Sequence, residues 1–275
     1  MASICQGYWR GGNLGFGQGQ AFTDGLCAFS AGSEQAWWRA RQCFVRRRCN
    51  PMSISRVEAY TTPRPDVSEM VPQAAKMILD VGCSNGALGA SLRFAVPGRQ
   101  VMGIENDTAL FTEAVTRLDQ VIQCDLNNFD WETAFPETQF DCIVFADVLE
   151  HLLDPPRHLL GAQRRLSRDG AIVISLPNIR HISALYSIFL SGTFPQRDRG
   201  IFDRTHLRWF TLKDAKRLVT DAGMRIDDVS YNLRVRDRGD GLLNKVARRL
   251  LDPVQDFSPI REFLAYQSCI RAVKA

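Results

Sequence analysis

Four features are missing from this chain of 275 residues, and each absence excludes a class of protein. No run of about 18 apolar residues occurs, so we expect no membrane-spanning helix. The first thirty residues lack the basic and then apolar pattern of a secretory signal. No two of the eight cysteines are spaced C-x-x-C, which argues against a zinc ribbon or a thioredoxin-type site. We therefore expect a cytoplasmic protein with reduced thiols.

The fourth absence is a basic surplus on the main body of the chain. The formal net charge is +4, but residues 1–50 alone carry six arginines against Asp24 and Glu34, which leaves 28 basic and 28 acidic residues in 51–275. A protein that grips nucleic acid through its phosphates usually keeps a positive surplus on its folded domain. We therefore expect no nucleic-acid partner.

Residues 1–51 differ from the rest of the sequence. Eight of the twenty glycines lie there, and no sustained helical or strand period accompanies them. Such a segment can hardly bury a core of its own. We interpret 1–51 as a disordered segment or an upstream extension, and 52–275 as the folded domain.

From residue 77 onward, short apolar runs alternate with helical patterns. This alternation predicts an α/β fold, a mostly parallel sheet with helices on both faces. The expected strands are 77–81, 100–105, 120–125, 140–147, 170–177, 224–232 and 261–273. The expected helices are 85–95, 107–119, 155–167 and 211–222, and the basic amphipathic segment 242–251 is expected to pack on the sheet, with membrane-surface contact as the lesser reading.

The stretch "ILDVGCSNGALG", residues 78–89, carries the first functional signal. A strand that ends in a glycine-rich turn before a helix brings backbone close to a ligand, beyond the carboxyl end of the sheet. No lysine occurs between 77 and 100, so this is not a phosphate-binding P-loop. A dinucleotide site would need G-x-G-x-x-G/A, and here Ser84 stands where the middle glycine belongs. Glu105, 23 residues after Gly82, keeps that alternative open.

The same stretch resembles motif I of class I S-adenosylmethionine (SAM)-dependent methyltransferases, which reads hydrophobic-hydrophobic-D-x-G-x-G-x-G. Asp80, Gly82 and Gly86 match the motif, and Ser84 replaces a glycine. The resemblance continues through "FDCIVFADVLEHLLDP" and "LSRDGAIVISLPN" and covers roughly residues 66–180. These motifs are similar to those of the type 11/12/23 methyltransferases, including ubiquinone O-methyltransferase and methionine-biosynthesis types. "RGIFDRTHLRWFT" (199–211) is similar to a loop of methyltransferases often encoded near glycosyltransferases.

This resemblance implies a Rossmann-like, seven-stranded, mostly parallel sheet with an antiparallel C-terminal strand, and S-adenosyl-L-methionine as cofactor. In the family, the acid at the end of the second strand holds the ribose, and the acid and apolar residue after the third strand contact the adenine. The implied cofactor residues are Asp80, Gly82, Cys83, Ser84, Gly86, Glu105, Asn106, Asp125, Leu126, Ala146 and Asp147. They lie in a cofactor half, 66–180, followed by acceptor-side elements in 181–275.

Methyl transfer needs alignment and, for a hydroxyl acceptor, a base. We expect His151 to be that base, with His206 and Asp147 as further catalytic candidates. Asn178, His181, Arg204 and Arg208 are expected to bind the acceptor. In some relatives of the ubiquinone type, acidic residues and a histidine near this point bind a divalent metal, but Glu150 and His151 match them only partly, so we predict no metal.

The sequence therefore predicts transfer of a methyl group from SAM to a small molecule or glycan, most readily at oxygen. Two alternatives remain open. One is an NAD-type oxidoreductase or epimerase on a similar sheet, and the other is a domain that binds SAM without catalysis.

Overall fold

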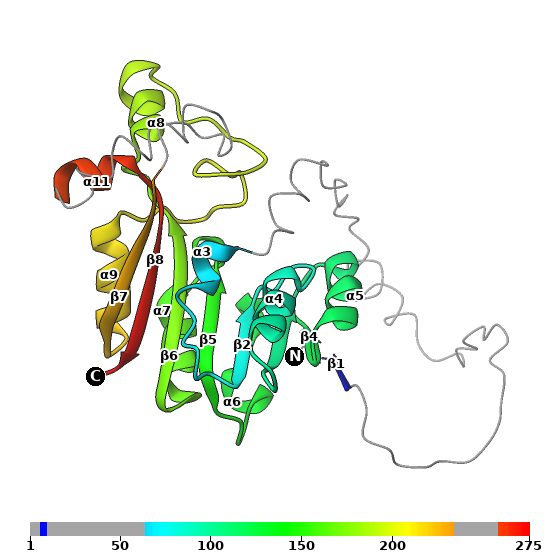
Figure 1. Cartoon of the computed structure of the whole chain (residues 1–275). Helices are drawn as coiled ribbons and strands as arrows, with labels where there is room; N and C mark the ends of the chain where they lie inside the picture. The colour runs from blue at the N-terminus through cyan, green and yellow to red at the C-terminus, as the bar shows by residue number, and fades with distance from the viewer. Residues whose placement is uncertain (1–5, 10–63, 234–257) are drawn as a thin grey trace, which may run out of the picture.

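One mixed sheet runs through the protein (Figure 1). The computed structural model describes residues 64–233 and 258–275, together with the backbone of residues 6–9. The strand order is β1-β4-β3-β2-β5-β6-β8-β7. The strands are β1 Gln6–Trp9, β2 Met77–Val81, β3 Gln100–Glu105, β4 Gln120–Gln123, β5 Phe140–Ala146, β6 Leu166–Pro177, β7 Met224–Leu233 and β8 Ala265–Lys274.

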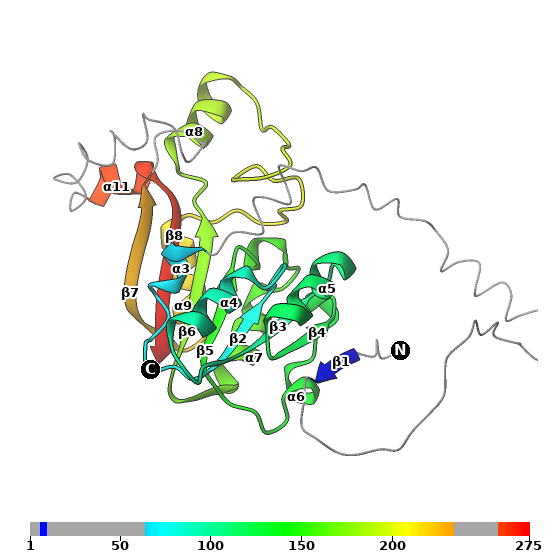
Figure 2. The same cartoon turned by 45° about the vertical axis from the view of Figure 1, so that its right-hand side comes forward.

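The direction of the strands agrees with the expected fold. Strands β4, β3, β2, β5 and β6 are parallel to one another, and β8 runs antiparallel between β6 and β7. All seven expected strands are present, so the predicted Rossmann-like sheet is confirmed. The turned view in Figure 2 shows β1 at one edge of the sheet and β7 at the other.

Strand β1 is a difference from the expectation, because no regular element was predicted within 1–51. Its four residues pair antiparallel with β4, from Gln6 opposite Gln123 to Trp9 opposite Gln120. An edge strand offers unpaired N–H and C=O groups, and a short segment containing Tyr and Trp is suited to pair with it. The other residues of 1–51 lie outside the described part of the chain.

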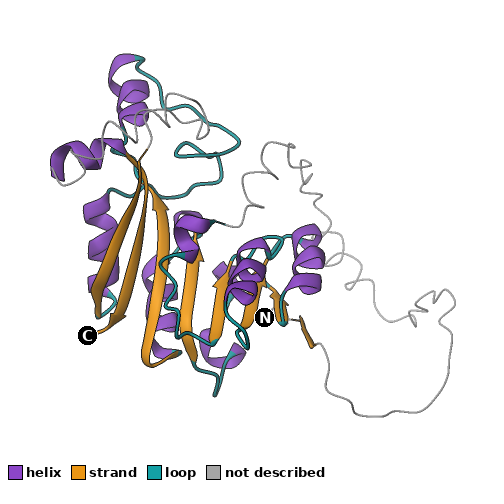
Figure 3. Cartoon of the chain, viewed as in Figure 1, coloured by secondary structure: helices purple, strands orange, loops and turns teal. Residues whose placement is uncertain are grey.

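Helices cover both faces of the sheet (Figure 3). One apolar core joins the sheet to α3, α4 and α5, and a second joins it to α6, α7 and α9. Successive residues of β2 alternate between them, since Ile78 lies in the first core and Leu79 in the second. The helices are α3 Pro65–Ser68, α4 Ala87–Ala95, α5 Thr108–Arg117, α6 Trp131–Ala134, α7 Pro155–Arg164, α8 Ile182–Leu185, α9 Leu212–Asp221 and α11 Ser258–Leu264, with short turns η1 Leu126–Asn128, η2 Leu149–His151 and η3 Tyr186–Leu190.

Local chemistry sets several helix ends. Asp107 begins α5, where its carboxylate accepts hydrogen bonds from the backbone N–H groups of Ala109 (2.9 Å) and Leu110 (3.0 Å). Thr211 and Asp214 form a reciprocal capping box at the start of α9. The predicted strand 261–273 was wrong at its start, because 258–264 forms helix α11. A Ser-Pro pair is a helix-start signal that the apolar pattern of "REFL" hides.

The parallel strands direct their carboxyl ends toward the same edge of the sheet, where α8 and the loop 199–211 lie (Figure 1). Within the described ranges, no helix is at once long enough and apolar enough to cross a bilayer. The predicted helix 242–251 lies outside the described residues.

Candidate active site

The turn after β2 requires glycine at its first position. Gly82 has φ +70°, and a Cβ atom built there would lie 2.6 Å from Cγ2 of Val148. Gly86 has φ +78° and is the N-cap residue of α4. Ser84, between them, also adopts a left-handed conformation, with φ 51°. The backbone therefore turns tightly at the strand ends, and the space of an ordinary side chain at Gly82 is already taken by Val148.

Glu105 ties this turn to the end of β3. Its Oε2 accepts a hydrogen bond from the backbone N–H of Ser84 at 2.8 Å, and its Oε1 accepts from those of Asn106 and Asp107, both at 2.8 Å. Burial raises the pKa of the carboxyl group, while these three N–H donors counteract that rise. A carboxylate has about four acceptor positions. Three are occupied within the protein, so the fourth can receive a donor from a ligand.

Asp80 is a buried acid beside the turn. Its side chain is 1% exposed, and its Oδ2 has no hydrogen-bond partner among the described residues. Burial, with repulsion from Glu105, raises its pKa to about 7. The hydroxyl group of Ser84 is also buried without such a partner. Buried polar atoms without partners are rare in folded proteins. These acceptors therefore fit a ligand with several donors, as the ribose and ammonium groups of SAM provide.

The other predicted cofactor residues lie around the same edge. Asp125 is exposed and caps η1, accepting from the N–H of Asn127 at 3.0 Å, and Leu126 beside it is buried. Cys83 is buried, and its backbone N–H donates to the Ile104 carbonyl at 2.9 Å, so it braces the turn against β3. Asn106 directly follows β3, and Ala146 is the last residue of β5. The structure thus brings the predicted set to one edge of the sheet.

Asp147 follows β5 in a left-handed conformation, with φ 58°. Its carboxylate pairs with the guanidinium of Arg64, accepts from the Gln267 amide and lies 3.3 Å from the hydroxyl of Ser175. Arg64 also pairs with Asp66 at 2.9 Å. Burial alone would lower the pKa of Arg64, but Asp147 and Asp66 raise it.

The sequence did not indicate Arg64, Ser175 and Gln267 as partners of Asp147. Arg64 precedes the region of resemblance, and the other two lie within strands, where a polar residue is unremarkable in an isolated sequence. Only the pairing of β6 with β8, which places Ser175 opposite Cys269 and Pro177 opposite Gln267, brings these side chains toward Asp147.

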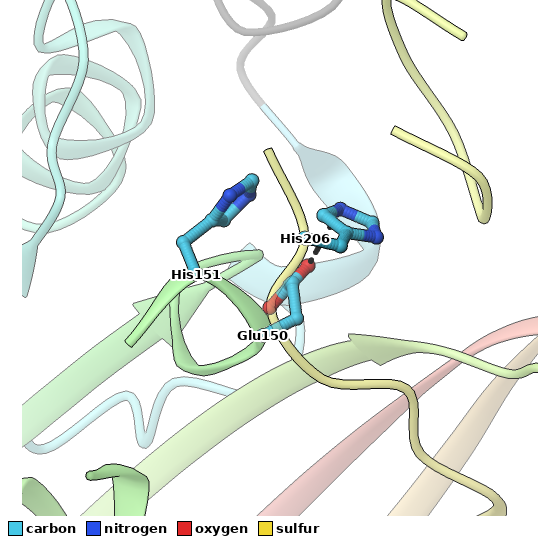
Figure 4. Close-up of side chains that lie close together, drawn as sticks. All are labelled: Glu150, His151 and His206. Atoms are coloured by element: carbon cyan, nitrogen blue, oxygen red, sulfur yellow. Dashed lines mark ion pairs between the residues drawn. The ribbon is translucent and has the colours of Figure 1, made fainter. Parts of the chain in front are cut away.

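Glu150, His151 and His206 form a cluster where the acceptor is expected, called here the acceptor-side cluster (Figure 4). Glu150 and His151 lie on the turn η2, which follows β5. His206 comes from the loop 199–211. The two imidazole rings contact edge to face with centroids 4.7 Å apart, and Nε2 of His206 lies 3.8 Å from Oε1 of Glu150.

The cluster is held together by the main chain of the loop. The backbone N–H groups of Leu207 and Arg208 both donate to the carbonyl oxygen of Glu150, at 2.9 and 3.1 Å. Because these bonds join the loop 199–211 to η2, His206 is fixed beside Glu150 and His151 by the fold. The sequence predicted both histidines but gave no reason for them to meet.

Burial disfavours charge on two members of the cluster, Glu150 and His206. It raises the pKa of Glu150 well above its usual value, and the nearby Asp147 adds to this rise. Burial, followed by repulsion from His151, lowers the pKa of His206 to about 4. Both carboxyl oxygens of Glu150 lack hydrogen-bond partners within the described part of the chain. Both shifts disfavour the charged forms of Glu150 and His206.

A metal ion would find suitable ligand types here. One donor atom from each of the three residues lies within 4.8 Å of the others, and a carboxylate with two imidazoles suits divalent transition metals. Our prediction of no metal is thus untested, and metal analysis of the protein decides it.

The four residues predicted to bind the acceptor are engaged within the protein. Asn178 is buried and donates to the carbonyl oxygens of Glu262 (2.7 Å) and Ala265 (2.9 Å). His181 is buried and caps α8, with Nδ1 2.8 Å from the hydroxyl of Ser183.

The two arginines are exposed but have partners of their own. Arg204 forms an ion pair with Asp198 at 2.6 Å, and Arg208 donates to the carbonyl oxygens of Leu152 and Leu153. Their role toward an acceptor remains a prediction.

Solved structures share this architecture. The magnesium protoporphyrin IX methyltransferase from Synechocystis matches with a TM-score of 0.52 and 14% identity, over 88% of this chain and 95% of its own. An S-adenosylmethionine-dependent methyltransferase from Mesorhizobium loti matches with a TM-score of 0.52 and 15% identity, over 76% of this chain and 96% of its own. The fold is therefore that of class I methyltransferases.

Curated relatives point the same way. The ubiquinone biosynthesis O-methyltransferase of Psychrobacter arcticus is 25% identical over 206 residues, which cover 70% of this chain and 78% of the relative. That of Pseudomonas paraeruginosa is 26% identical over 217 residues, covering 75% and 86%. Matches to other curated relatives cover as little as 62% of their length.

A family model extends over most of the domain. The model described as methionine biosynthesis protein MetW matches residues 64–250, which is more than half of the chain. With the curated relatives and the shared fold, this match confirms the resemblance to SAM-dependent methyltransferases that the motifs indicated. The chain belongs to the MetW family.

Proposed function

We propose that this protein is a cytoplasmic enzyme that transfers a methyl group from SAM to a hydroxyl group of a small molecule or sugar. The observation that carries the proposal is the convergence of three features at one sheet edge: the glycine turn, the buried acceptor Asp80 and the anchored carboxylate Glu105. The family and the curated relatives support the reaction class.

The donor half of the site consists of groups already fixed by the fold. Glu105, held by three backbone N–H groups, has an acceptor position left for a ribose hydroxyl, and Asp80 offers an unpartnered oxygen for another donor. Leu126 and Asp125 would flank the adenine. When bound, SAM supplies a methyl group activated by a positively charged sulfur. The protein's contribution is to align that group with the acceptor.

His151 is the base in this proposal. Its Nδ1 lies 3.2 Å from the carbonyl oxygen of Thr205, an acceptor, so in the neutral ring this nitrogen carries the hydrogen. Nε2 is then the basic nitrogen. In the transfer, the hydroxyl proton of the acceptor would pass to Nε2 of His151 as its oxygen bonds to the methyl carbon, and the carbon–sulfur bond would break to leave S-adenosylhomocysteine. His206 is less suited as a base, because its pKa is lowered to about 4.

Oxygen is favoured over nitrogen as the methylated atom because the curated relatives are O-methyltransferases and the cluster provides a base. We expect no nucleic acid as substrate, since the charge of the main body is balanced.

Binding titrations separate the proposal from its alternatives. We expect S-adenosylhomocysteine to bind the full chain and NAD not to bind. A matched pair of variants distinguishes loss of the site from a general effect of removing a carboxylate: Asp80→Asn in the site, and Asp169→Asn at an exposed position near the start of β6. Binding of NAD, or equal behaviour of both variants toward S-adenosylhomocysteine, contradicts the donor site.

Methyl transfer to a panel of hydroxyl acceptors then tests catalysis. If the protein binds S-adenosylhomocysteine but methylates no acceptor of the panel, the result contradicts the proposed methyltransferase activity. It then favours a SAM-binding domain without catalysis. Transfer to amines alone contradicts the preference for oxygen.

A further inference from the structure

The loop 199–211 carries a chain of hydrogen bonds that ends on His151. The hydroxyl group of Thr205 donates to Oδ1 of Asp203 at 2.6 Å, and the backbone N–H of Thr205 donates to the same oxygen at 2.9 Å. Oγ1 of Thr205 lies 3.2 Å from Nδ1 of His151, and the Thr205 carbonyl oxygen lies at the same distance. Asp203 itself is buried, at 1% exposed.

These contacts fix the direction of each hydrogen. A threonine hydroxyl has one hydrogen, and here the short bond to the Asp203 carboxylate takes it. Oγ1 can therefore present only a lone pair to His151. Since the Thr205 carbonyl is also an acceptor, Nδ1 of His151 faces two acceptors, and a bare Nδ1 would be repelled by both.

We propose that Asp203 and Thr205 are positioning residues that hold His151 as the Nδ1–H tautomer, so that Nε2 is the nitrogen that accepts a proton. This inference rests on the proposed role of His151 as the base. A carboxylate that orients a histidine through one ring nitrogen, and so sets the basicity of the other, is a recurring arrangement in catalytic sites. Here the Asp203 carboxylate does not contact His151 itself but orients the Thr205 hydroxyl group, which contacts Nδ1 of His151.

The other titratable neighbours of His151 do not replace this pair. His206 contacts the ring of His151 edge to face, and its Nδ1 lies 3.2 Å from the Ile201 carbonyl, so its own proton is directed away from His151. Glu150 faces His206 at 3.8 Å. Asp147 is engaged by Arg64 and Gln267.

A purely structural role for Asp203 is the competing explanation. Its backbone N–H donates to Gly200 and its carbonyl accepts from His206, both within the loop, so Asp203 also shapes the loop. A structural role alone predicts no effect on the tautomer of His151 as long as the loop keeps its fold. The tautomer is therefore the property to measure.

The test is ¹⁵N NMR of the histidine rings in the full chain, at about pH 8.5, where histidines are neutral. The chain has four histidines, so a His151→Gln variant assigns the signals. We expect Nδ1 of His151 to show the shift of a protonated nitrogen and Nε2 that of a bare one. Thr205→Val removes the hydroxyl acceptor but keeps the carbonyl acceptor. It should therefore shift both nitrogens part of the way toward the opposite tautomer, and Thr205→Ser should retain the original pattern.

Two results would overturn the inference: a protonated Nε2 in the unaltered protein, or the same ring shifts in Thr205→Val as in the unaltered protein. Should Thr205→Val not fold, Asp203→Asn provides the second test, because an amide in place of the carboxylate weakens the hold on the Thr205 hydrogen. It should shift the tautomer in the same direction, and an unchanged pattern would count against the pair.

The measurement needs neither SAM nor an acceptor, so the two hypotheses can fail separately. If S-adenosylhomocysteine does not bind while His151 shows the Nδ1–H pattern, the proposed function fails and the positioning stands. If it binds while His151 shows the reverse pattern, only the positioning fails.

Discussion

Replacement of Glu105 tests the donor site most directly. Its carboxylate accepts three backbone N–H groups, at 2.8 Å each, and has one of about four acceptor positions left for a ligand. In Glu105→Gln, an N–H₂ group replaces one oxygen and faces donors, and the negative charge is lost. A hydrogen bond to a charged group contributes roughly 1.5–3 kcal/mol. We therefore expect S-adenosylhomocysteine to bind about 10- to 150-fold more weakly.

Isothermal titration of the unaltered protein and the variants measures this loss. Glu105→Ala should weaken binding at least as much, because the turn at Ser84 also loses its anchor. Glu137→Gln is the matched control, since this exposed acid precedes β5, at the end of the sheet opposite the site. The affinity of this variant for S-adenosylhomocysteine should stay within about twofold of the unaltered protein's. Full affinity in both Glu105 variants would refute the assignment of this carboxylate to the ribose.

Three further outcomes are expected. Because the pKa of Asp80 is raised to about 7, the free energy of unfolding of the ligand-free protein should fall as pH rises from about 4 to 7, by up to about 1.4 kcal/mol per pH unit. Urea unfolding of Asp80→Asn should show a weaker dependence on pH, and an unchanged dependence contradicts a buried titrating acid. Gly82→Ala should destabilise the protein by about 2–4 kcal/mol through backbone strain and the clash with Val148. Gly98 has φ +76° but open space around it, so Gly98→Ala should cost only the strain, about 1 kcal/mol. Equal melting temperatures of the two variants would argue against the clash. Finally, elemental analysis of the purified protein should find no stoichiometric transition metal, and a chelator should not change its melting temperature; one bound ion lost on mutation of the acceptor-side cluster would reverse that prediction.

The sequence predicted the parts of the structure that repeat a short pattern. Apolar runs such as "MILDV" and "FDCIVFA" identified the buried strands, and the glycines after β2 indicated a tight turn at the ligand edge. Those patterns are local, because burial on both faces of a strand and left-handed φ angles each leave a signature in a few neighbouring residues. The parallel order of the strands then follows from the helical connections.

Contacts between distant segments left no such signature. Arg64 and Gln267 meet at Asp147 although about 200 residues separate them, and nothing near either one indicates a partner. The pairing of His151 with Thr205 likewise spans 54 residues. Asn178 and His181 follow β6 near the sheet edge, as expected. Their side chains, however, form hydrogen bonds within the protein, to the Glu262 carbonyl and the Ser183 hydroxyl.

The two bonds from the amides of Leu207 and Arg208 to Glu150 have an evolutionary consequence. Any residue except proline provides an amide, so these two bonds do not depend on which side chains the loop carries. The exposed side chain of Leu207 can thus be replaced without loss of either bond to η2. Under the proposed function, substitution at such positions would change the surface near the methyl acceptor, while the groups that hold the methyl donor stay the same.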